Sequence, residues 1–319
     1  MKRKVNRVGQ NTLTVSLPSK WVKENHIERG DSLVLVPKQN TLKISTTEKK
    51  THSSIHVDIT NYNKTLVKRI MDHIYLKEIQ KVILTFKNQD IADYRHKKRI
   101  SIHKFLQKLS ERFIGLEIVN QQPDRIVYQN MFRLSNPKNI EQINQRVAYL
   151  LQDFLHEFMM GLKKDPVEFQ EICKDYHDRI TKFIGLHNRI TKQSNLSAQA
   201  KTSYYLLNSH LDKIADKIVH AAKRAIQIRK PSLKLIEGTK ELLMLLKAYF
   251  QILLKKKLAI DSVDLLWGKR YSSFRKLTKI NFSKDDLFVL QELRTILDLC
   301  NNFTEVHLAV HMREMVDED

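Results

Sequence analysis

The chain has 319 residues, of which 56 are Lys or Arg and 35 are Asp or Glu, so its formal net charge is +21. This length gives room for two or three domains, and the charge favours a polyanionic partner, either nucleic acid or an anionic membrane surface. No apolar run approaches the roughly 18 residues of a membrane span, and none follows the positively charged start. We therefore expect no secretion, no membrane insertion, and a cytoplasmic location in which Cys173 and Cys300 are buried thiols.

The first 45 residues show the pattern of two short β-hairpins joined by a helical turn. Apolar residues alternate with polar ones at Val5, Leu13, Val15 and Leu17, and again at Leu33, Leu35, Leu42 and Ile44 around Gln39-Asn40. Between the two patterns, Pro18 ends the strand, and Trp21, Val22 and Ile27 predict one helical turn. A segment of this size buries only about half of its surface, so its own core is marginal. We expect residues 1–47 to form a domain in which two chains interleave.

Positive charge is concentrated in the same segment. It holds nine Lys or Arg residues and three Asp or Glu residues, a net charge of +6, and four of the nine lie within the first seven positions. Two such arms related by a two-fold axis would neutralise several phosphates, with an affinity that falls as salt rises. An ordinary solvated basic terminus is the alternative. The clustering favours nucleic-acid binding.

The segment Arg7–Pro18 (RVGQNTLTVSLP), followed by Trp21-Val22 and Gly30-Asp31, resembles the swapped-hairpin AbrB-type DNA-binding domain. The resemblance implies that two chains intertwine into one β-structure that contacts double-stranded DNA beside the first hairpin. The expected DNA-contacting residues, including the basic arm, are Lys2, Arg3, Lys4, Arg7, Lys20 and Lys23. Domains of this type also serve as plain dimerisers, or as antitoxins bound to a partner.

Residues 55–135 alternate strand and helix patterns and predict a small α/β domain. Strands are expected at 55–59, 81–86, 116–119 and 125–128, the last two forming a closing hairpin, and helices at 66–75 and 101–113. The densest basic run of the chain, Arg95-His-Lys-Lys-Arg99, lies inside this domain. It is either a second contact to a polyanion or a solvated loop, and such a charge run favours the solvated loop.

From residue 139 to 316 the pattern changes to long amphipathic helices, in a chain with only seven glycines. Pro166 and Pro231 stand where helices are expected to begin. Six helices are expected, near 139–164, 166–192, 198–229, 232–257, 261–278 and 284–315. The pairs Leu211-Asp212 and Leu297-Asp298, 86 residues apart, suggest a duplication into repeats at about 139–229 and 232–316. The expected fold class is thus a multidomain α+β protein with a C-terminal pair of three-helix bundles.

Asp212, Asp216 and His220 recur at every fourth residue beside an apolar stripe of the third of these helices. This spacing stacks two carboxylates and an imidazole on one helix face, a set of ligands that suits divalent cations. The alternative is a solvated face on which nearby Lys and Arg residues supply counter-charges, and the spacing by itself favours it.

The segment Asp165–Arg189 together with Leu211–Asp216 resembles the PhoU family of phosphate-uptake regulators, and the whole chain resembles archaeal PhoU-domain proteins. The resemblance implies two three-helix bundles, each with an acidic motif that gathers divalent or trivalent metal ions. It places metal ligands at Asp212 and Asp216. The second motif reads Asp298, Asn302 and then Glu305, so an amide replaces its second carboxylate.

No motif of an enzyme is present: there is no Gly-rich phosphate loop, no GxSxG elbow and no HExxH helix. His307 and His311 have a spacing that can hold a metal, but such pairs are more often ordinary surface or core histidines. The protein is therefore not expected to be an enzyme.

Taken together, these patterns predict a dimeric, cytoplasmic transcriptional regulator of phosphate uptake or metabolism. Its N-terminal domain would bind double-stranded DNA, and its helical tail would respond to a metal, a phosphate signal or a partner. The alternative is a PhoU-type signalling adaptor that docks on a phosphate transporter component or a histidine kinase, with the N-terminal domain serving only to dimerise. The alternative predicts no tight DNA binding.

Overall fold

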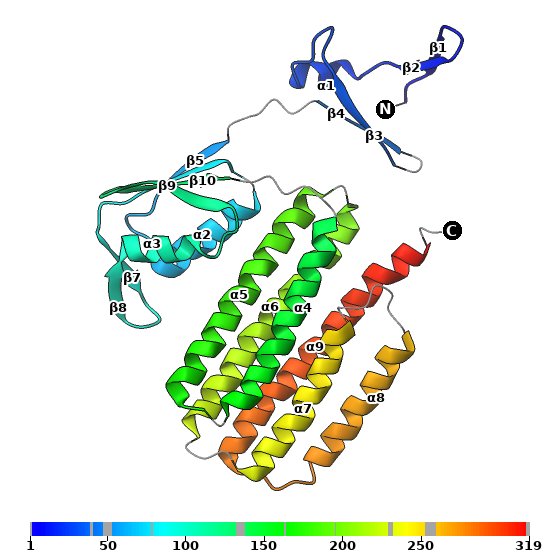
Figure 1. Ribbon diagram of the computed structural model, residues 1–319. Helices are drawn as coiled ribbons and strands as arrows, with labels where there is room; N and C mark the ends of the chain where they lie inside the picture. The colour runs from blue at the N-terminus through cyan, green and yellow to red at the C-terminus, as the bar shows by residue number, and fades with distance from the viewer. Residues whose placement is uncertain are drawn as a thin grey trace. The chain divides into compact units, whose positions relative to one another are not determined.

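The computed structural model describes residues 2–38, 41–46, 53–77, 79–131, 138–162, 164–194, 196–228, 232–252 and 260–316. The chain divides into two compact units, residues 1–53 and residues 54–319. The first unit contains strands and one short helix, the second unit begins with a strand, and helices make up the C-terminal part of the chain (Figure 1). The predicted mixture of β and α structure is confirmed at this level.

The first unit, called the head below, consists of two antiparallel hairpins and a short helix. Strand β1 (Val5–Val8) pairs with β2 (Thr12–Val15), α1 (Ser19–Glu24) follows, and β3 (Leu33–Lys38) pairs with β4 (Thr41–Thr46). Gly9 turns the first hairpin with a φ of +70°, a left-handed conformation that favours glycine. Both expected hairpins and the helical turn are confirmed, while Gln39-Asn40 lies outside the described residues. The exchange of hairpins between two chains stays a prediction.

The second unit begins with an α/β domain built on a four-stranded sheet. The strand order is β5 (Ser54–Asp58), β6 (Lys81–Thr85), β10 (Arg125–Asn130) and β9 (Leu116–Gln122). Strands β5 and β6 are parallel and the other neighbours are antiparallel, so the expected closing hairpin is confirmed as β9–β10. Helices α2 (Lys64–Leu76) and α3 (Ile102–Ser110) lie on one side of the sheet (Figure 1). Their buried apolar residues belong to one core with those of the sheet.

One hairpin in this domain was not expected from the sequence. Strand β7 (Asp90–Asp93) pairs with β8 (Lys98–Ser101), and the turn between them contains Arg95, His96 and Lys97. The interpretation of the basic run as a loop is therefore wrong for Lys98 and Arg99, which are strand residues, although all five basic positions are exposed. Half of the residues in these two four-residue strands are charged, so the strands give no clear alternation of apolar and polar positions, which is the signal used to predict strands.

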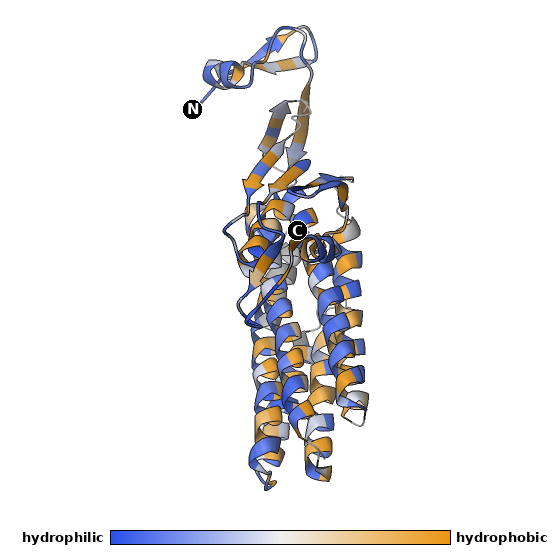
Figure 2. Cartoon of the chain, turned by 90° about the vertical axis from the view of Figure 1, so that its left-hand side faces the viewer, coloured by the Kyte–Doolittle hydropathy of each residue, from blue (hydrophilic) through white to orange (hydrophobic). Residues whose placement is uncertain are grey.

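The described residues from 138 on contain six helices, as the sequence predicted. They are α4 (Lys138–Gly161), α5 (Pro166–Gln193), α6 (Ala198–Gln227), α7 (Leu233–Ile252), α8 (Ile260–Leu277) and α9 (Lys284–Val316). Asp165 caps α5 by accepting hydrogen bonds from the backbone N–H groups of Val167 and Glu168, with Pro166 in the first turn as expected. Pro231 lies outside the described residues. Apolar and polar residues form stripes along these helices (Figure 2).

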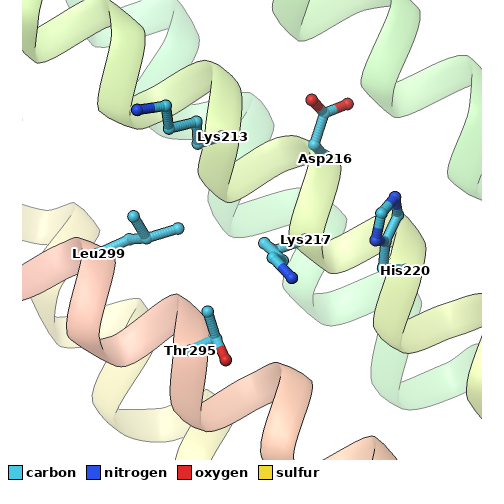
Figure 3. Close-up of a pocket in the computed structure, with 6 residues that line it drawn as sticks. All are labelled: Lys213, Asp216, Lys217, His220, Thr295 and Leu299. Carbon is cyan, nitrogen blue, oxygen red and sulfur yellow. The ribbon is translucent and has the colours of Figure 1, made fainter.

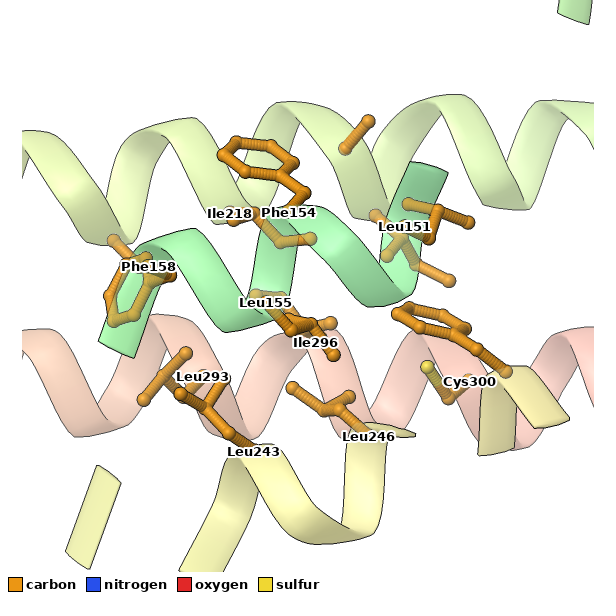
Figure 4. Packing of buried hydrophobic residues seen from close by; sticks show 14 of the residues in the cluster. Leu151, Phe154, Leu155, Phe158, Ile218, Leu243, Leu246, Leu293, Ile296 and Cys300 are labelled. Atoms are coloured by element: carbon orange, nitrogen blue, oxygen red, sulfur yellow. The ribbon is translucent and has the colours of Figure 1, made fainter. Parts of the chain in front are cut away.

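The helical core is continuous across both proposed repeats. Helix α6 packs along α9, and α4 packs against both α5 and α7. Phe154 of α4 lies beside Ile218 of α6, while Phe158 of α4 lies on the side of Leu293 of α9 and Leu243 of α7 (Figure 4). Both cysteines are buried, as expected, and burial raises the pKa of the Cys173 thiol to about 12. None of the described helices is long and apolar enough to cross a membrane.

The α/β domain is attached to the helices by a buried arginine. Arg189 of α5 is 1% exposed and donates hydrogen bonds to the carbonyl oxygen of Ile114, at 3.2 Å, and to Oδ1 of Asn130, at 2.7 Å. Its guanidinium lies 4.7 Å from the centre of the Tyr75 ring of α2. A buried cation is costly unless it is hydrogen-bonded, so these contacts hold the α/β domain against α5.

Candidate functional site

The head presents apolar side chains that it does not bury. In the first hairpin, the register places Val5 opposite Val15 and Arg7 opposite Leu13, so these side chains share one face. Val5 is 62% exposed and Leu13 is 70% exposed. In the second hairpin, Leu35 faces Ile44 and Pro37 faces Leu42, and Leu35 and Leu42 are 55% and 52% exposed. None of the side chains described between residues 2 and 46 is buried.

The predicted DNA-contacting residues of the head are all exposed. Lys2, Arg3 and Lys4 precede β1, Arg7 lies within β1, and Lys20 and Lys23 lie on α1. Arg7 donates hydrogen bonds from Nε, at 3.1 Å, and Nη2, at 2.5 Å, to the carbonyl oxygen of Gln10. Its Nη1 group takes no part in these two bonds. Arg7 therefore both fixes the turn of the first hairpin and keeps an exposed cationic edge.

The acidic pair of α6 contacts a histidine that the sequence pattern did not indicate. Oδ1 of Asp216 lies 2.9 Å from Nε2 of His177 on α5, and Nδ1 of His177 lies 3.4 Å from Oδ1 of Asp178. Burial by itself lowers the pKa of His177, but the hydrogen bonds and negative charges of Asp178 and Asp216 raise it to about 9. His177 is therefore a cation at neutral pH, paired with two carboxylates.

Asp212 differs from Asp216 in its surroundings. Burial, and then the negative charge of Asp216, raise the pKa of Asp212, whereas the hydrogen bond to His177 lowers the pKa of Asp216. No hydrogen bond or ion pair to Asp212 is found among the described residues. The negative charge of Asp216 is thus paired with His177, whereas Asp212 interacts only with charges at longer range.

Those longer-range charges come partly from the α/β domain. Arg112, which follows α3, lies 3.8 Å from Asp178 between Nη1 and Oδ1. Burial, and then the charge of Arg112, lower the pKa of Lys68 on α2. The negative charge of Asp212 acts in the opposite direction, so Lys68 lies within electrostatic reach of Asp212. The acidic pair therefore faces basic residues of the α/β domain.

A shallow groove of about 260 Å³ lies between α6 and α9 next to this pair. Its lining consists of Lys213, Asp216, Lys217, His220, Thr295 and Leu299 (Figure 3). The carboxylate of Asp216 points away from α9 in this view, while Lys217 reaches towards α9. Nζ of Lys217 lies 3.0 Å from Oε2 of Glu292. The predicted third member of the acidic stripe, His220, thus lines the groove together with two lysines.

The second predicted motif has a different partner. Arg270 of α8 donates a hydrogen bond from Nη2 to Oδ1 of Asp298, so a permanent cation occupies the position next to this carboxylate. Asn302 and Glu305 follow on α9 and are exposed. The first motif is thus paired with a titratable imidazole, and the second with a guanidinium.

Within the described part of the chain, no three His, Cys, Asp or Glu side chains are grouped so that they could hold a metal ion. Asp212, Asp216 and His177 therefore do not form such a group, and neither do Asp298 and Glu305 beside Asn302. The side chains of His307 and His311 lie outside the described residues. The metal ion at these motifs therefore stays a prediction.

The residues missed from the sequence are His177, Arg112, Lys68, Arg189 and Arg270. Each acts through a contact between elements that are distant in the chain, such as the 39 residues between His177 and Asp216. Arg189 is the one residue among these that the sequence could have indicated, because it lies next to Ile190 in the apolar pattern of α5. A charged residue in that position needs a partner, but the pattern does not identify it.

No protein-family model matches the chain, and no curated protein matches it. The resemblances to AbrB-type domains and to the PhoU family therefore rest on the quoted motifs alone.

Proposed function

We propose that the protein is a DNA-binding transcriptional regulator that acts as a homodimer, with the head as its DNA-binding and dimerisation domain. The observation that carries the proposal is the combination found in the head. It buries none of its described side chains, several apolar residues share one face in each hairpin (Val5, Leu13 and Val15 in the first, Leu35, Leu42 and Ile44 in the second), and its predicted DNA-contacting residues are exposed. A protein of this kind would regulate phosphate uptake or metabolism, as the PhoU-like motifs of the tail suggest.

The exposed apolar faces favour a second copy of the same chain. Burying one Val, Leu or Ile side chain contributes about 1.5–3 kcal/mol, so covering Val5, Leu13, Leu35 and Leu42 would decide whether the head is stable. A swapped or interleaved dimer covers both hairpins of each chain in one step. It also brings two basic arms together, which doubles the number of phosphates that the protein can neutralise.

The helical tail would serve as the receiver of the signal. The charged cluster of Asp212, Asp216 and His177 faces Lys68 and Arg112 of the α/β domain, so a ligand that changes the charge of the cluster changes the forces between the two domains. A metal ion or a docked partner would have this effect. Such coupling requires a ligand that binds the DNA-competent state and the other state with different affinities.

The test is fluorescence anisotropy of the full chain with a duplex from its own promoter region and with a scrambled duplex, titrated across salt. The head variant is Lys4→Gln/Arg7→Gln, and the control is Lys269→Gln/Lys279→Gln, which removes the same charge from exposed positions on and after α8. We expect selective binding that the head variant weakens about 10-fold or more and the control leaves intact.

Weak and unselective binding that is equal in the head variant and the control would contradict the proposal. The signalling adaptor would then account better for the chain, because its head only dimerises. Controls with phosphate and with a divalent metal show whether either ligand changes the DNA affinity.

A further inference from the structure

We propose that the β7–β8 hairpin, residues 90–101, is a second DNA-contacting element that binds the phosphate backbone of duplex DNA without reading its sequence. The inference rests on the proposed function, since it concerns the same nucleic acid. It assigns a role to the basic run Arg95–Arg99, which the head does not need for its own contacts.

The hairpin is a fixed structure, anchored at the base of its turn. Asp93 is 4% exposed, and its Oδ2 accepts hydrogen bonds from Nζ of Lys64 at 2.8 Å and from His96 at 2.9 Å. Arg99 donates from Nη2 to the carbonyl oxygen of Asp90 across the two strands at 2.9 Å. These bonds tie the turn to α2 and hold β7 and β8 together, so the basic side chains of the turn are presented from a rigid base.

The charge of the hairpin is not compensated locally. Residues 90–101 hold four Lys or Arg residues, all between positions 95 and 99, and two carboxylates, Asp90 and the buried Asp93. Within the described structure, Arg95, Lys97 and Lys98 are exposed and no carboxylate lies within ion-pair distance of them. The buried carboxylate of Asp93 at the base of the turn is already bound to Lys64 and His96. An external polyanion is the partner that this charge fits.

Lys97 supports the same inference through its backbone. Its φ is +49°, a left-handed conformation that costs a residue other than Gly or Asn on the order of 1 kcal/mol. A turn selected for stability alone would place Gly or Asn there. Strained residues of this kind gather at binding sites, where the side chain serves a purpose that outweighs the strain.

Duplex DNA fits the hairpin better than an anionic membrane does. A two-stranded ribbon can follow a groove of the duplex, with its basic side chains beside the phosphates. Tyr94, which is 74% exposed, is the only large apolar side chain exposed between residues 90 and 101. Its hydroxyl can donate a hydrogen bond to a phosphate oxygen. Insertion into a lipid surface requires a larger apolar face than one tyrosine.

The experiment compares the full chain with two triple variants. The hairpin variant is Arg95→Gln/Lys97→Gln/Lys98→Gln, and the control is Lys269→Gln/Arg275→Gln/Lys279→Gln, which removes three exposed charges on and after α8. Affinity for promoter and scrambled duplexes is measured across salt. We expect the hairpin variant to bind both duplexes about 10-fold or more weakly, with an unchanged ratio between them. The slope of log affinity against log salt should shrink by about 0.9 for each phosphate that the variant no longer neutralises.

Equal affinities and salt slopes in the hairpin variant and the control would overturn the inference. If the hairpin variant and its control bind equally while the head variant loses the selective binding, only the inference fails and the proposed function stands. A wild-type chain that binds no duplex would overturn both. Binding to vesicles of phosphatidylserine and phosphatidylcholine that the hairpin variant abolishes, with unchanged DNA binding, would assign the hairpin to membranes and also overturn the inference.

A single substitution tests whether misfolding, and not the loss of charge, weakens DNA binding. Lys97→Gly removes one charge and relieves the left-handed strain, so its melting temperature should equal or exceed that of the wild type. We expect its salt slope to shrink by about 0.9 while its selectivity is retained. A more stable variant with an unchanged salt slope would contradict a contact between Lys97 and phosphate.

Discussion

The head and the second unit differ in how completely they bury their apolar residues. The helices of the second unit enclose Phe154, Phe158 and Leu293 completely, whereas Leu13 and Leu35 of the head are more than half exposed. Both regions carry regular apolar patterns. A pattern therefore determines which face is apolar, while the number of packed layers decides whether that face is covered within one chain.

The same contrast separates two kinds of stability. The second unit buries its apolar residues in cores of its own, one in the α/β domain and one among the helices, and should unfold independently of protein concentration. The head, by the proposed function, depends on a second copy, so its stability should follow mass action.

The largest effect is expected from a charge on the apolar face of the head. Leu35→Asp should convert the dimer into a monomer and weaken selective DNA binding about 1,000-fold, because two linked arms bind far more tightly than one. The matched control is Val34→Asp, because Val34 is 43% exposed and lies on the face of β3 opposite to Leu35. It introduces the same charge without changing the face that holds Leu35 and Leu42. Sedimentation equilibrium and anisotropy measure both variants. A Leu35→Asp variant that stays dimeric would show that this apolar face does not hold two chains together.

A large effect confined to the second unit is expected at Arg189. The change Arg189→Ala leaves Oδ1 of Asn130 without its donor and leaves the carbonyl oxygen of Ile114 with Tyr75 as its remaining donor. It also removes a buried side chain, so the free energy of unfolding should fall by about 3 kcal/mol. Arg179→Ala, on the exposed face of the same helix, should cost less than about 1 kcal/mol. Urea denaturation gives both values, with dimerisation unchanged. Similar losses in the two variants would show that burial at Arg189 is unimportant.

A smaller, pH-dependent effect is expected at His177. Its folded pKa of about 9 lies above its ordinary value near 6.5, so its contribution is complete below about pH 6.5 and is lost as pH rises through 9. Because both carboxylate partners are partly exposed, the loss should be about 1–2 kcal/mol. His177→Gln should flatten this part of the stability profile measured by urea denaturation. An identical profile in both proteins would exclude the pairing with Asp178 and Asp216.

The smallest effects come from two glycines and have opposite signs. Gly30 in the head has a φ of +98°, so Gly30→Ala should destabilise the head by about 1 kcal/mol and weaken dimerisation accordingly. Gly268 lies within α8 with open space around it, so Gly268→Ala should stabilise the second unit by about 0.5–1 kcal/mol. Dimer dissociation and thermal melting report the two changes. Equal signs would argue against the assigned conformations.

Local patterns in the sequence predicted the elements whose signal is local. The helical spacing of apolar residues predicted α4 to α9, and Pro166 indicated where α5 begins. The alternating residues of the head were on the expected faces, as the strand register shows. The hairpin β7–β8 was missed because its strands are short and half of their residues are charged, and because its anchor, Asp93, depends on Lys64 of another element.

The candidate sites were harder to predict because they depend on contacts between elements. The spacing of Asp212 and Asp216 located an acidic face, but it could not show that His177 approaches Asp216 or that Arg270 binds Asp298. Spacing along one helix records only neighbours on that helix. Contacts from other helices depend on the packing of the whole unit, which no single segment encodes.

Whether the head binds DNA as a dimer can be decided by native mass spectrometry of the full chain mixed with its promoter duplex and, separately, with the scrambled duplex. We expect a complex of two chains and one duplex that forms selectively with the promoter sequence, and the Leu35→Asp variant should not form it. A complex of one chain per duplex with full selectivity, or no complex at all, would contradict the proposal that the head binds DNA as a dimer.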